Sequence, residues 1–576
     1  MAGKNKKFNK AVDGSEFICY LKCTVQNNEK SERQGLAQPN KERGECEMQK
    51  NMQGKMRKAV ALALAGMAIL GIFAACAKEP APQEGTAQSQ PMEENQGAAS
   101  AQRRDTLTIA TESEPPTLHP FDQKAVTTGY MTALVYNRLT RIDPETLEPQ
   151  LDLAAAYENV GETEWVFTLR QGVKFHDGSS LDAQDVKASM EYAQTFATTR
   201  DYTSFCKEVQ VVDDYTVKIV TDGPYAMTLN DLASLCVLPS ELIDAGADFN
   251  ETPVGTGPYR FVEWVRGDRL SFEKNQEFFD QDRQPSIRHI VWRVVPEGSS
   301  RTIALQAGEA DFVMEVEAAD IGRLEEDETL RVQKNDGTRL NFFAMNSEIA
   351  PFDNKLFRKA VSSAIDRDAV VTVACDGEAQ AAVSHASPAF AGSSDVNAAG
   401  YDPEKAKEYL AQSGIDPEKA SFTCVVSNDT ARRTAEVIQA NLAEIGVKMD
   451  IESMDYAAHL NAIMSGNYTT AVAGYTSSNL YSFVSGLYHS SAVNAANLAR
   501  VQDPMVDFLI DTAKTQLDPA EQRETFVKLS EYLNDWTAFA PLYQTTVVRA
   551  YHKDLKGVVV GKNGNVPFEL VHWAEE

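Results

Sequence analysis

The chain has 576 residues, of which 43% are hydrophobic, 24% charged and 9% aromatic, and its formal net charge at pH 7 is −28. This composition excludes a collagen-like or wholly disordered chain and provides enough apolar material for two or three domains. The acidity argues against nucleic acid as a partner, because a phosphate backbone attracts basic proteins.

A segment near the N-terminus has the features of a bacterial export signal. The uncharged apolar stretch Ala59–Cys76 follows the basic residues Lys55, Arg57 and Lys58. Its 18 residues are also just enough for a plain membrane anchor. The run Phe-Ala-Ala-Cys that ends at Cys76 resembles a lipobox, in which the cysteine is lipidated and becomes the mature N-terminus. We therefore expect a lipidated Cys76, with the plain anchor as the alternative.

The segments around this signal are not expected to fold. Residues 1–55 contain no motif and no apolar period, so we interpret them as an over-extended, disordered start. Residues 56–76 form the lipoprotein signal peptide. Residues 77–104 are rich in Pro, Gln, Glu, Gly, Ala and Ser and are expected to form a flexible tether.

The cysteines and histidines do not predict a metal site. Beyond Cys76 the chain has Cys206, Cys236, Cys375 and Cys424, without a Cys-x-x-Cys pair. The eight histidines contain no i, i+4 pair. Export would permit a Cys206–Cys236 disulfide, but single buried thiols are favoured in a chain of this size.

The first predicted elements of the folded part have an α/β order. Thr106–Ala110 is a short β-prone run, and after the proline-rich loop 114–120 a helix-like apolar segment covers Tyr130–Leu139. Trp165–Leu169 alternates apolar and polar residues, which predicts a strand with one buried face.

A capped helix and a hairpin follow. Asp182 and Asp185 are expected to cap a helix over 183–196. Two alternating runs, Tyr259–Val265 and Arg269–Glu273, flank Arg-Gly-Asp and predict a hairpin. We interpret this tripeptide as a turn rather than an adhesion motif, because glycine and aspartate favour tight turns.

The second half of the chain predicts further α/β structure. Asp353 is expected to be the N-cap of a helix, because apolar residues recur at helical spacing from Leu356 to Ile365. Another such stripe ends at Gly446, before a β-prone run over Val447–Ile451.

Motifs of known enzyme classes are nearly absent. The zinc-protease, nucleophile-elbow, phosphate-loop and dinucleotide motifs do not occur. Ser204-Phe-Cys-Lys207 matches the S-x-x-K of penicillin-recognising enzymes, in which serine and lysine lie one helical turn apart, but it has no K-T-G partner. A cell-surface hydrolase of that type is therefore an alternative hypothesis.

Six ordered segments resemble extracellular solute-binding protein family 5, the large binding proteins of peptide and nickel ABC importers, which include dipeptide- and oligopeptide-binding proteins. The resemblance runs from about Asp105 to the C-terminus. The most specific segment is Trp165–Val186, which contains Thr168-Leu-Arg-Gln-Gly-Val-Lys-Phe-His-Asp-Gly178. The other segments are Glu114-Pro-Pro-Thr-Leu-His-Pro120, Val254-Gly-Thr-Gly-Pro-Tyr259, Ala307-Gly-Glu-Ala-Asp311, Arg358-Lys-Ala-Val361 with Ala364-Ile-Asp-Arg367, and Tyr401-Asp-Pro-Glu-Lys-Ala406.

The resemblance implies a fold and a role. The fold is α/β and bilobal, of the periplasmic-binding-protein type (type II, the large form with three subdomains), with a hinge that lets the lobes enclose a ligand. Lobe I would cover 105–300 plus 545–576, with an extra N-terminal subdomain, and lobe II would cover 301–544. The protein would be no enzyme, would need no cofactor or metal, and would act as a monomer anchored outside the bacterial cell membrane. Its partners would be the permease subunits of an ABC importer and a peptide-like or other small solute; a ligand sensor or adhesin without a transporter is the alternative.

The resemblance also places the ligand site. In peptide-binding members the corresponding loop resembles A-G-W-x-x-D; its aspartate pairs with the free ammonium of the ligand, and its backbone adds to the peptide as a strand would. In the matching stretch Val472–Tyr481 that position is Ser478. Loss of a charge-assisted hydrogen bond predicts about ten- to a hundredfold weaker binding of a free N-terminus. If the alignment is shifted, another acid such as Asp122 takes this role.

The candidate contacts come from this loop, from an aromatic wall and from the opposite lobe. They are Tyr475, Thr476, Ser477, Ser478, Tyr456, Phe121, Asp122, Lys124, Asn346 and Tyr543. The cargo is left open among dipeptides, oligopeptides, a nickel chelate, haem, glutathione and oligosaccharides, because the sequence does not define the shape of the cleft. The missing aspartate favours cargo other than ordinary free peptides.

Overall fold

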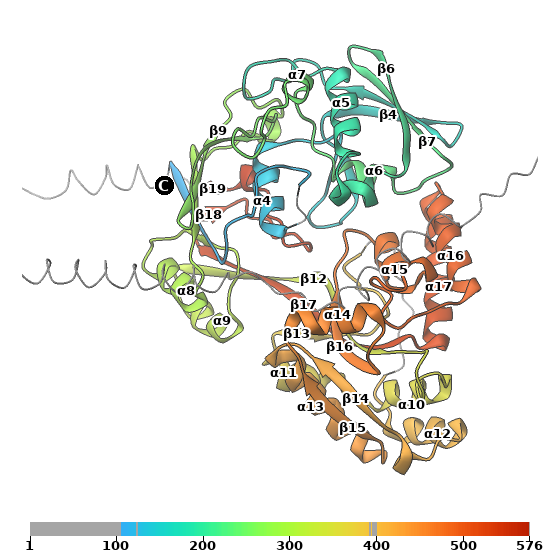
Figure 1. Cartoon of the computed structure of the whole chain (residues 1–576). Coiled ribbons are helices and arrows are strands. Elements are labelled where there is room, and N and C mark those ends of the chain that lie inside the picture. The colour runs from blue at the N-terminus through green and yellow to red at the C-terminus, as the bar shows by residue number, and fades with distance from the viewer. Residues whose placement is uncertain (1–104, 123–124, 391–392, 394–399, 575–576) are drawn as a thin grey trace, which may run out of the picture. The chain divides into compact units, whose positions relative to one another are not determined.

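The computed structural model describes residues 105–122, 125–390, 393 and 400–574 (Figure 1). The predicted signal peptide, the tether, the lipidation site Cys76 and the candidate contact Lys124 lie outside these residues. The chain divides into the units Met1–Gln90 and Pro91–Glu576, and all described residues belong to the second. None of the helices in the described part is long and apolar enough to cross a membrane.

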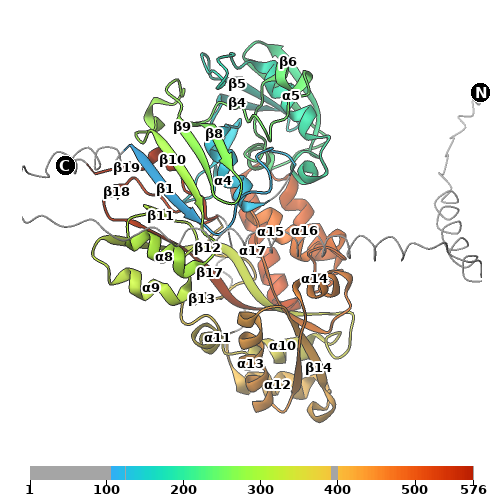
Figure 2. The same cartoon turned by 60° about the vertical axis from the view of Figure 1, so that its left-hand side comes forward.

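The main sheet has 11 strands, and two long strands lie in its middle. Its order is β15 (Lys448–Ser453), β14 (Ser421–Val426), β16 (Thr470–Tyr475), β12 (Leu330–Met345), β17 (Phe539–His552), β11 (Phe312–Val313), β1 (Thr106–Thr111), β10 (His289–Val294), β9 (Arg269–Lys274) and β8 (Tyr259–Val265), with β13 (Ala379–Ala381) beside β17. The strands β12 and β17 pair antiparallel over most of their length, so they join the two ends of the sheet (Figures 1 and 2). The predicted Arg-Gly-Asp hairpin is confirmed as β8–β9, with Gly267 at φ 73° in its turn.

A second sheet of four strands follows the first helix. Its order is β4 (Ala154–Val160), β5 (Glu164–Leu169), β7 (Thr216–Thr221) and β6 (Cys206–Asp213), and two small pairs are β2 (Thr140–Ile142) with β3 (Pro149–Leu151) and β18 (Leu555–Lys556) with β19 (His572–Trp573). The predicted alternation of β5 is confirmed, because Trp165, Phe167 and Leu169 are buried whereas Thr168 is exposed.

The α-helices lie mainly in the second half of the described chain. They are α4 (Val126–Val135), α5 (Ala183–Ala193), α6 (Thr228–Leu232), α7 (Ser240–Asp244), α8 (Gly298–Gln306), α9 (Ala318–Glu325), α10 (Lys355–Ala364), α11 (Arg367–Ala374), α12 (Pro403–Ser413), α13 (Asp429–Glu444), α14 (Tyr456–Ser465), α15 (Leu480–Tyr488), α16 (Pro504–Thr515) and α17 (Pro519–Trp536). The predicted caps of α5 are confirmed as a capping box of Asp182 and Asp185. Gly446, at φ 81°, ends the α13 region as predicted.

Two helix boundaries differ from the predictions. The N-cap of α10 is Asn354 rather than Asp353, because the helix begins at Lys355 and the Asn354 side chain accepts from the backbone N–H of Leu356 at 2.9 Å. The predicted helix over 130–139 begins earlier and ends at Val135, after which Tyr136 is extended.

The hydrophobic side chains form separate cores. One core contains residues from 107 to 314 and from 555 to 571, whereas two others contain residues from 340 to 543 together with Leu147. All four cysteines of the described part are free, and Cys375 is the one that is not fully buried. The Cys206–Cys236 disulfide that the sequence left open is therefore not formed.

Candidate functional site

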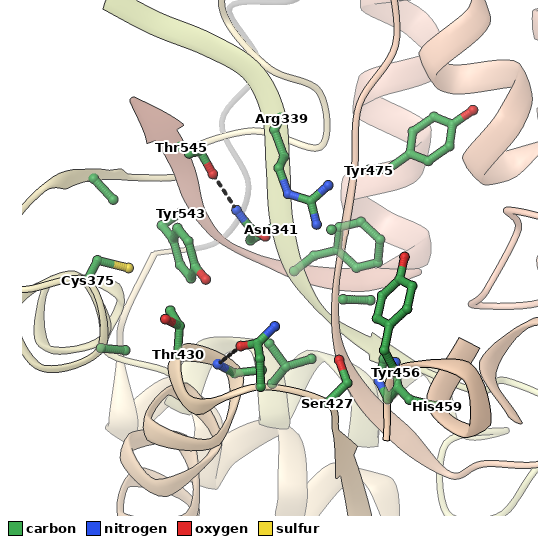
Figure 3. Close-up of a pocket in the computed structure, with 18 of the residues that line it drawn as sticks. Arg339, Asn341, Cys375, Ser427, Thr430, Tyr456, His459, Tyr475, Tyr543 and Thr545 are labelled. Atoms are coloured by element: carbon green, nitrogen blue, oxygen red, sulfur yellow. Dashed lines mark hydrogen bonds between the residues drawn. The ribbon is translucent and has the colours of Figure 1, made fainter. Parts of the chain in front are cut away.

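A cavity of about 870 Å³ lies beside the long central strands (Figure 3). The strands β12, β16 and β17 and the helices α13 and α14 contribute to its walls. Ligand pockets of proteins typically have volumes of about 300 to 1,000 Å³. The cavity therefore has room for a small molecule or a short peptide.

Polar side chains from two paired strands form one wall of the cavity. Arg339 and Asn341 lie two residues apart on β12, and Tyr543 and Thr545 lie two residues apart on β17 (Figure 3). Side chains two residues apart on a strand share a face, so both pairs reach the same cavity. The Asn341 Nδ2 donates to Thr545 Oγ1 at 2.9 Å. This hydrogen bond holds the amide of Asn341 in one orientation.

An irregular stretch of β12 precedes Arg339. Asp336 pairs with Thr546 and Leu340 pairs with Gln544, so β12 advances by four residues where β17 advances by two. Bulges of this kind change the direction in which a side chain points and are frequent beside binding sites. Gly337 is required here, because a Cβ at this position would lie 2.5 Å from the Thr545 carbonyl oxygen.

The ring of Tyr475 lines the cavity at the end of β16, the strand next to β12. Tyr475 ends β16, and its ring packs edge to face against Phe483 of α15 with centroids 5.5 Å apart. A Cβ at Gly486 would lie 2.3 Å from the Tyr475 hydroxyl, so the glycine makes room for this ring. Burial raises the pKa of Tyr475, so the phenol stays neutral and can donate or accept a hydrogen bond.

An apolar stripe of α14 lines the cavity next to these rings. Tyr456, Leu460 and Met464 lie four residues apart and are 68%, 38% and 36% exposed. Residues at this spacing share one face of a helix. Apolar side chains that line a cavity and stay accessible are typical of a ligand site. The stripe therefore offers an apolar contact surface to a bound molecule.

A second cavity of about 900 Å³ adjoins the first. Tyr475, Ala495 and Ala496 line both cavities, so they lie where the two meet. The charged residues of the second cavity are Asp201, Asp222, Asp231, Asp511 and Lys514. This cavity is therefore mainly acidic. No group of His, Cys, Asp and Glu within the described residues is arranged to hold a metal ion.

One aspartate of the second cavity has an unusual protonation. Burial raises the pKa of Asp231 to about 7, and the carboxylate accepts a hydrogen bond from the Tyr225 hydroxyl at 2.7 Å. The nearby Asp201 adds to the increase. Asp231 is therefore partly neutral at physiological pH.

The structure brings three of the predicted contacts together. Tyr456, Tyr475 and Tyr543 all line the first cavity, from α14, β16 and β17 (Figure 3). Burial raises the pKa of Tyr543 to about 12. These three side chains are far apart in sequence and share one cavity.

The predicted loop contacts lie between β16 and α15. Thr476 and Ser478 are exposed and Ser477 is half-buried, and none of the three lines either cavity. The Ser478 Oγ accepts from Asn479 Nδ2 at 3.3 Å, and Asn479 caps α15. The role of Ser478 at the place of an ammonium-binding aspartate stays a prediction.

The remaining predicted contacts lie elsewhere. Phe121 is buried against the rings of Tyr192 and Phe196, with centroids about 6 Å away, and its neighbour Asp122 is exposed. Asn346 is buried, and its Nδ2 donates to the carbonyl oxygens of residues 466 and 468, each at 3.0 Å. These hydrogen bonds occupy its amide and tie the end of β12 to the loop before β16.

Sequence reasoning missed several residues of the first cavity. They include Arg339, Asn341, Ser427, Thr430, His459 and Thr545. The polar residues Arg339 and Asn341 alternate with Leu340 and Phe342, so a period-two pattern was available to find them.

For His459, burial lowers the pKa, so the ring is neutral.

The structure removes the basis of the hydrolase hypothesis. Ser204 lies in a turn and Lys207 lies in β6, where its side chain is exposed. The two residues are therefore not one helical turn apart, as the S-x-x-K motif requires. Ser204 does line the second cavity.

Proteins named as glutathione-binding proteins match most of the chain. The glutathione-binding protein GsiB of Salmonella paratyphi A is 30% identical over 476 residues, which cover 78% of this chain and 91% of the relative. GsiB of Escherichia coli K12 is 28% identical over 488 residues, covering 80% and 93%.

Solved structures of low identity share the fold. HbpA2 of Haemophilus parasuis has a TM-score of 0.75 at 24% identity, with 82% of this chain and 100% of that chain covered. The periplasmic binding protein DppA of Helicobacter pylori, in complex with the peptide STSA, has a TM-score of 0.68 at 24% identity, with 83% and 100% covered. These likenesses confirm the predicted α/β fold of type II periplasmic binding proteins.

The family itself is identified by a match that includes much of the site. Residues 148–495 match the family described as Bacterial extracellular solute-binding proteins, family 5 Middle. This range contains β12, β16, α13 and α14 and most of the residues that line the cavity. The chain therefore belongs to family 5 of the bacterial extracellular solute-binding proteins.

Proposed function

We propose that this protein is the substrate-binding lipoprotein of an ABC importer and that it captures a peptide-like small solute in the first cavity. The observation that carries the proposal is the cavity of about 870 Å³ within the family-matched region, lined by Tyr456, Tyr475 and Tyr543. Its size suits a short peptide, and its aromatic and apolar walls suit side chains of a ligand. The relatives named as glutathione-binding proteins support a peptide-like cargo.

The proposed delivery follows the design of the family. Lipidation of Cys76 would hold the protein outside the cell membrane, and residues 77–104 would give it reach. Lobe I (105–300 plus 545–576) and lobe II (301–544) would close on the cargo by a hinge motion. The permease would then bind the closed form. The protein would then do no chemistry of its own.

Binding is tested with the full chain purified in detergent. Native mass spectrometry identifies any co-purified small molecule, and calorimetry measures binding of glutathione and of the tripeptide Ala-Phe-Ala. Tyr475→Ala is expected to weaken binding at least about tenfold, because it removes a buried aromatic contact. Tyr401→Ala is the matched control, because this exposed tyrosine does not line either cavity. A wild-type protein that carries no ligand and binds neither probe would contradict the proposal.

Anchoring is tested separately in cells. An alkyne-labelled fatty acid should be incorporated into the wild-type protein, and Cys76→Ser should abolish both the label and membrane association. Labelling that persists in Cys76→Ser would show that the lipidation site is elsewhere.

A further inference from the structure

The charged side chains of the first cavity are paired, with one exception. The charged residues in its lining are Glu317, Arg339, Asp376, Glu378 and Arg433. The ion pairs are Glu317 with Arg301 at 3.5 Å, Asp376 with Arg433 at 3.1 Å, and Glu378 with Lys334 at 2.9 Å. Arg339 is exposed on the cavity wall, and within the described part of the chain it has no carboxylate within ion-pair distance. Its guanidinium group is therefore solvated rather than ion-paired, and it is available to an anionic ligand.

The backbone around Arg339 is held in place. The irregular stretch of β12 before it is fixed at the Gly337 carbonyl oxygen, which accepts from Ser387 Oγ at 3.1 Å and from the amide of Gln544. Both Ser387 and Gln544 are buried. The strand therefore presents Arg339 from a rigid support rather than from a mobile loop.

The neighbouring strand leaves space for the guanidinium group. A Cβ at Gly474 of β16 would lie 2.7 Å from the Arg339 Nη2 and 2.4 Å from the Asn341 Oδ1. Both side chains therefore lie over a backbone position that has no side chain. Figure 3 shows Arg339 extending beside β16 into the space between Tyr475 and Tyr543.

The adjoining cavity determines where an anionic group would bind. The second cavity is lined by four aspartates and one lysine, so it repels an anion. The first cavity offers the unpaired guanidinium, and its planar fork of donors matches the two oxygens of a carboxylate. A molecule with one carboxylate is therefore expected to place it in the first cavity.

We propose that Arg339 binds a carboxylate of the cargo, so that the cargo is a small molecule with a free acid group and an apolar part that contacts the stripe of α14. The proposal rests on the first cavity being the cargo site. Arg339 then determines specificity for acids over their amides. The arginine would hold the acid end while Tyr456, Leu460 and Met464 contact the apolar part.

The experiment compares an acid with its amide. Calorimetry on the full chain measures Ala-Phe-Ala, which has a free carboxylate, and Ala-Phe-Ala-amide, which does not. The wild-type protein is expected to bind the acid about ten- to a hundredfold more tightly than the amide, and Arg339→Gln should remove this preference by weakening binding of the acid alone. Arg339→Lys should restore part of it, because lysine keeps the charge without the planar fork.

The matched control is Arg331→Gln, at an exposed position of the same strand outside both cavities. It should keep the full preference for the acid. A thermal midpoint of Arg339→Gln equal to that of the wild type would show that the variant is folded.

The outcomes separate the two proposals. If the wild type binds acid and amide equally, or if Arg339→Gln weakens both equally, the role of Arg339 is wrong while the cavity remains the cargo site. If the wild type binds neither tripeptide nor glutathione and carries no ligand in native mass spectrometry, the proposed function fails, and the role of Arg339 fails with it.

Discussion

The two cavities that meet at Tyr475 are similar in volume but differ in charge. Among the described residues, the first cavity, of about 870 Å³, has one cation without an ion-pair partner and an apolar stripe, whereas the second, of about 900 Å³, has four aspartates and one lysine. Paired strands of the large sheet form one wall of the first cavity and hold Arg339, Asn341, Tyr543 and Thr545, whereas helices and loops complete it. The second includes Asp201 and Asp231, which lie outside the sheet, together with residues of α15 and α16. The volumes of the two cavities therefore do not show which one binds the cargo. Their charges, and the sheet that holds the polar side chains of the first, do distinguish them.

The largest expected effect is on stability and concerns Asp231 in the second cavity. Its folded pKa of about 7 lies above the usual value of about 4, so the protonated form is favoured in the folded state. This contribution to stability is fully present below about pH 4 and is lost as the pH rises to about 7. The amide in Asp231→Asn does not titrate, so the variant should lack this fall in stability. The free energy of unfolding of Asp231→Asn relative to the wild type should therefore rise by up to about 4 kcal/mol between pH 4 and pH 8.

Denaturant unfolding at several pH values measures this difference. Asp222→Asn is the control, because Asp222 lines the same cavity but is exposed. If Asp231→Asn and the wild type have the same dependence of stability on pH, the pKa of Asp231 is not raised in the folded protein.

The next effect concerns the space above β16 in the first cavity. Gly474→Ala places a methyl group where the side chains of Arg339 and Asn341 lie, so both must move. We expect about tenfold weaker binding of Ala-Phe-Ala, equivalent to about 1.4 kcal/mol, while the acidic second cavity is unchanged. Gly322→Ala is the matched control, because a Cβ there meets no atom within 4 Å. Unchanged binding by Gly474→Ala would mean that Arg339 is not held at this place.

The smallest effect concerns the apolar stripe of α14. Leu460→Ala should weaken binding of Ala-Phe-Ala by about 1 kcal/mol, or about fivefold, because less apolar surface is buried in the complex. Binding of Ala-Ala-Ala should change less. Leu460→Met should behave as the wild type, because it keeps an apolar side chain of similar volume. An equal loss for both tripeptides would indicate that the stripe does not contact the apolar part of the cargo.

Local features of the fold were predictable where neighbours in sequence decide them. The capping box at Asp182 and Asp185, the buried face of β5 and the turn at Gly267 depend on residues within one element or one turn. The N-cap of α10 was misplaced by one residue, because Asp353 and Asn354 are both good caps and the start of the helix decides between them. The aromatic residues Tyr456, Tyr475 and Tyr543 came from the family resemblance, and the structure places them in one cavity.

The importance of Arg339 was not predictable in this way. Arg339 is exposed rather than paired. Whether an arginine in a strand is paired depends on side chains more than 30 residues away in sequence, such as Glu378 and Asp376. The close approach of Gly474 also depends on strand pairing between β12 and β16.

By itself the sequence determined the family resemblance, the order of strands and helices in several regions, and the expected export signal, because these depend on local pattern and residue type. Only the tertiary structure decided which strands lie side by side, which charges are paired, and which polar side chains reach a common cavity. The physical reason is that electrostatic pairing and packing depend on distances in space, and the antiparallel pairing of β12 with β16 and β17 sets those distances.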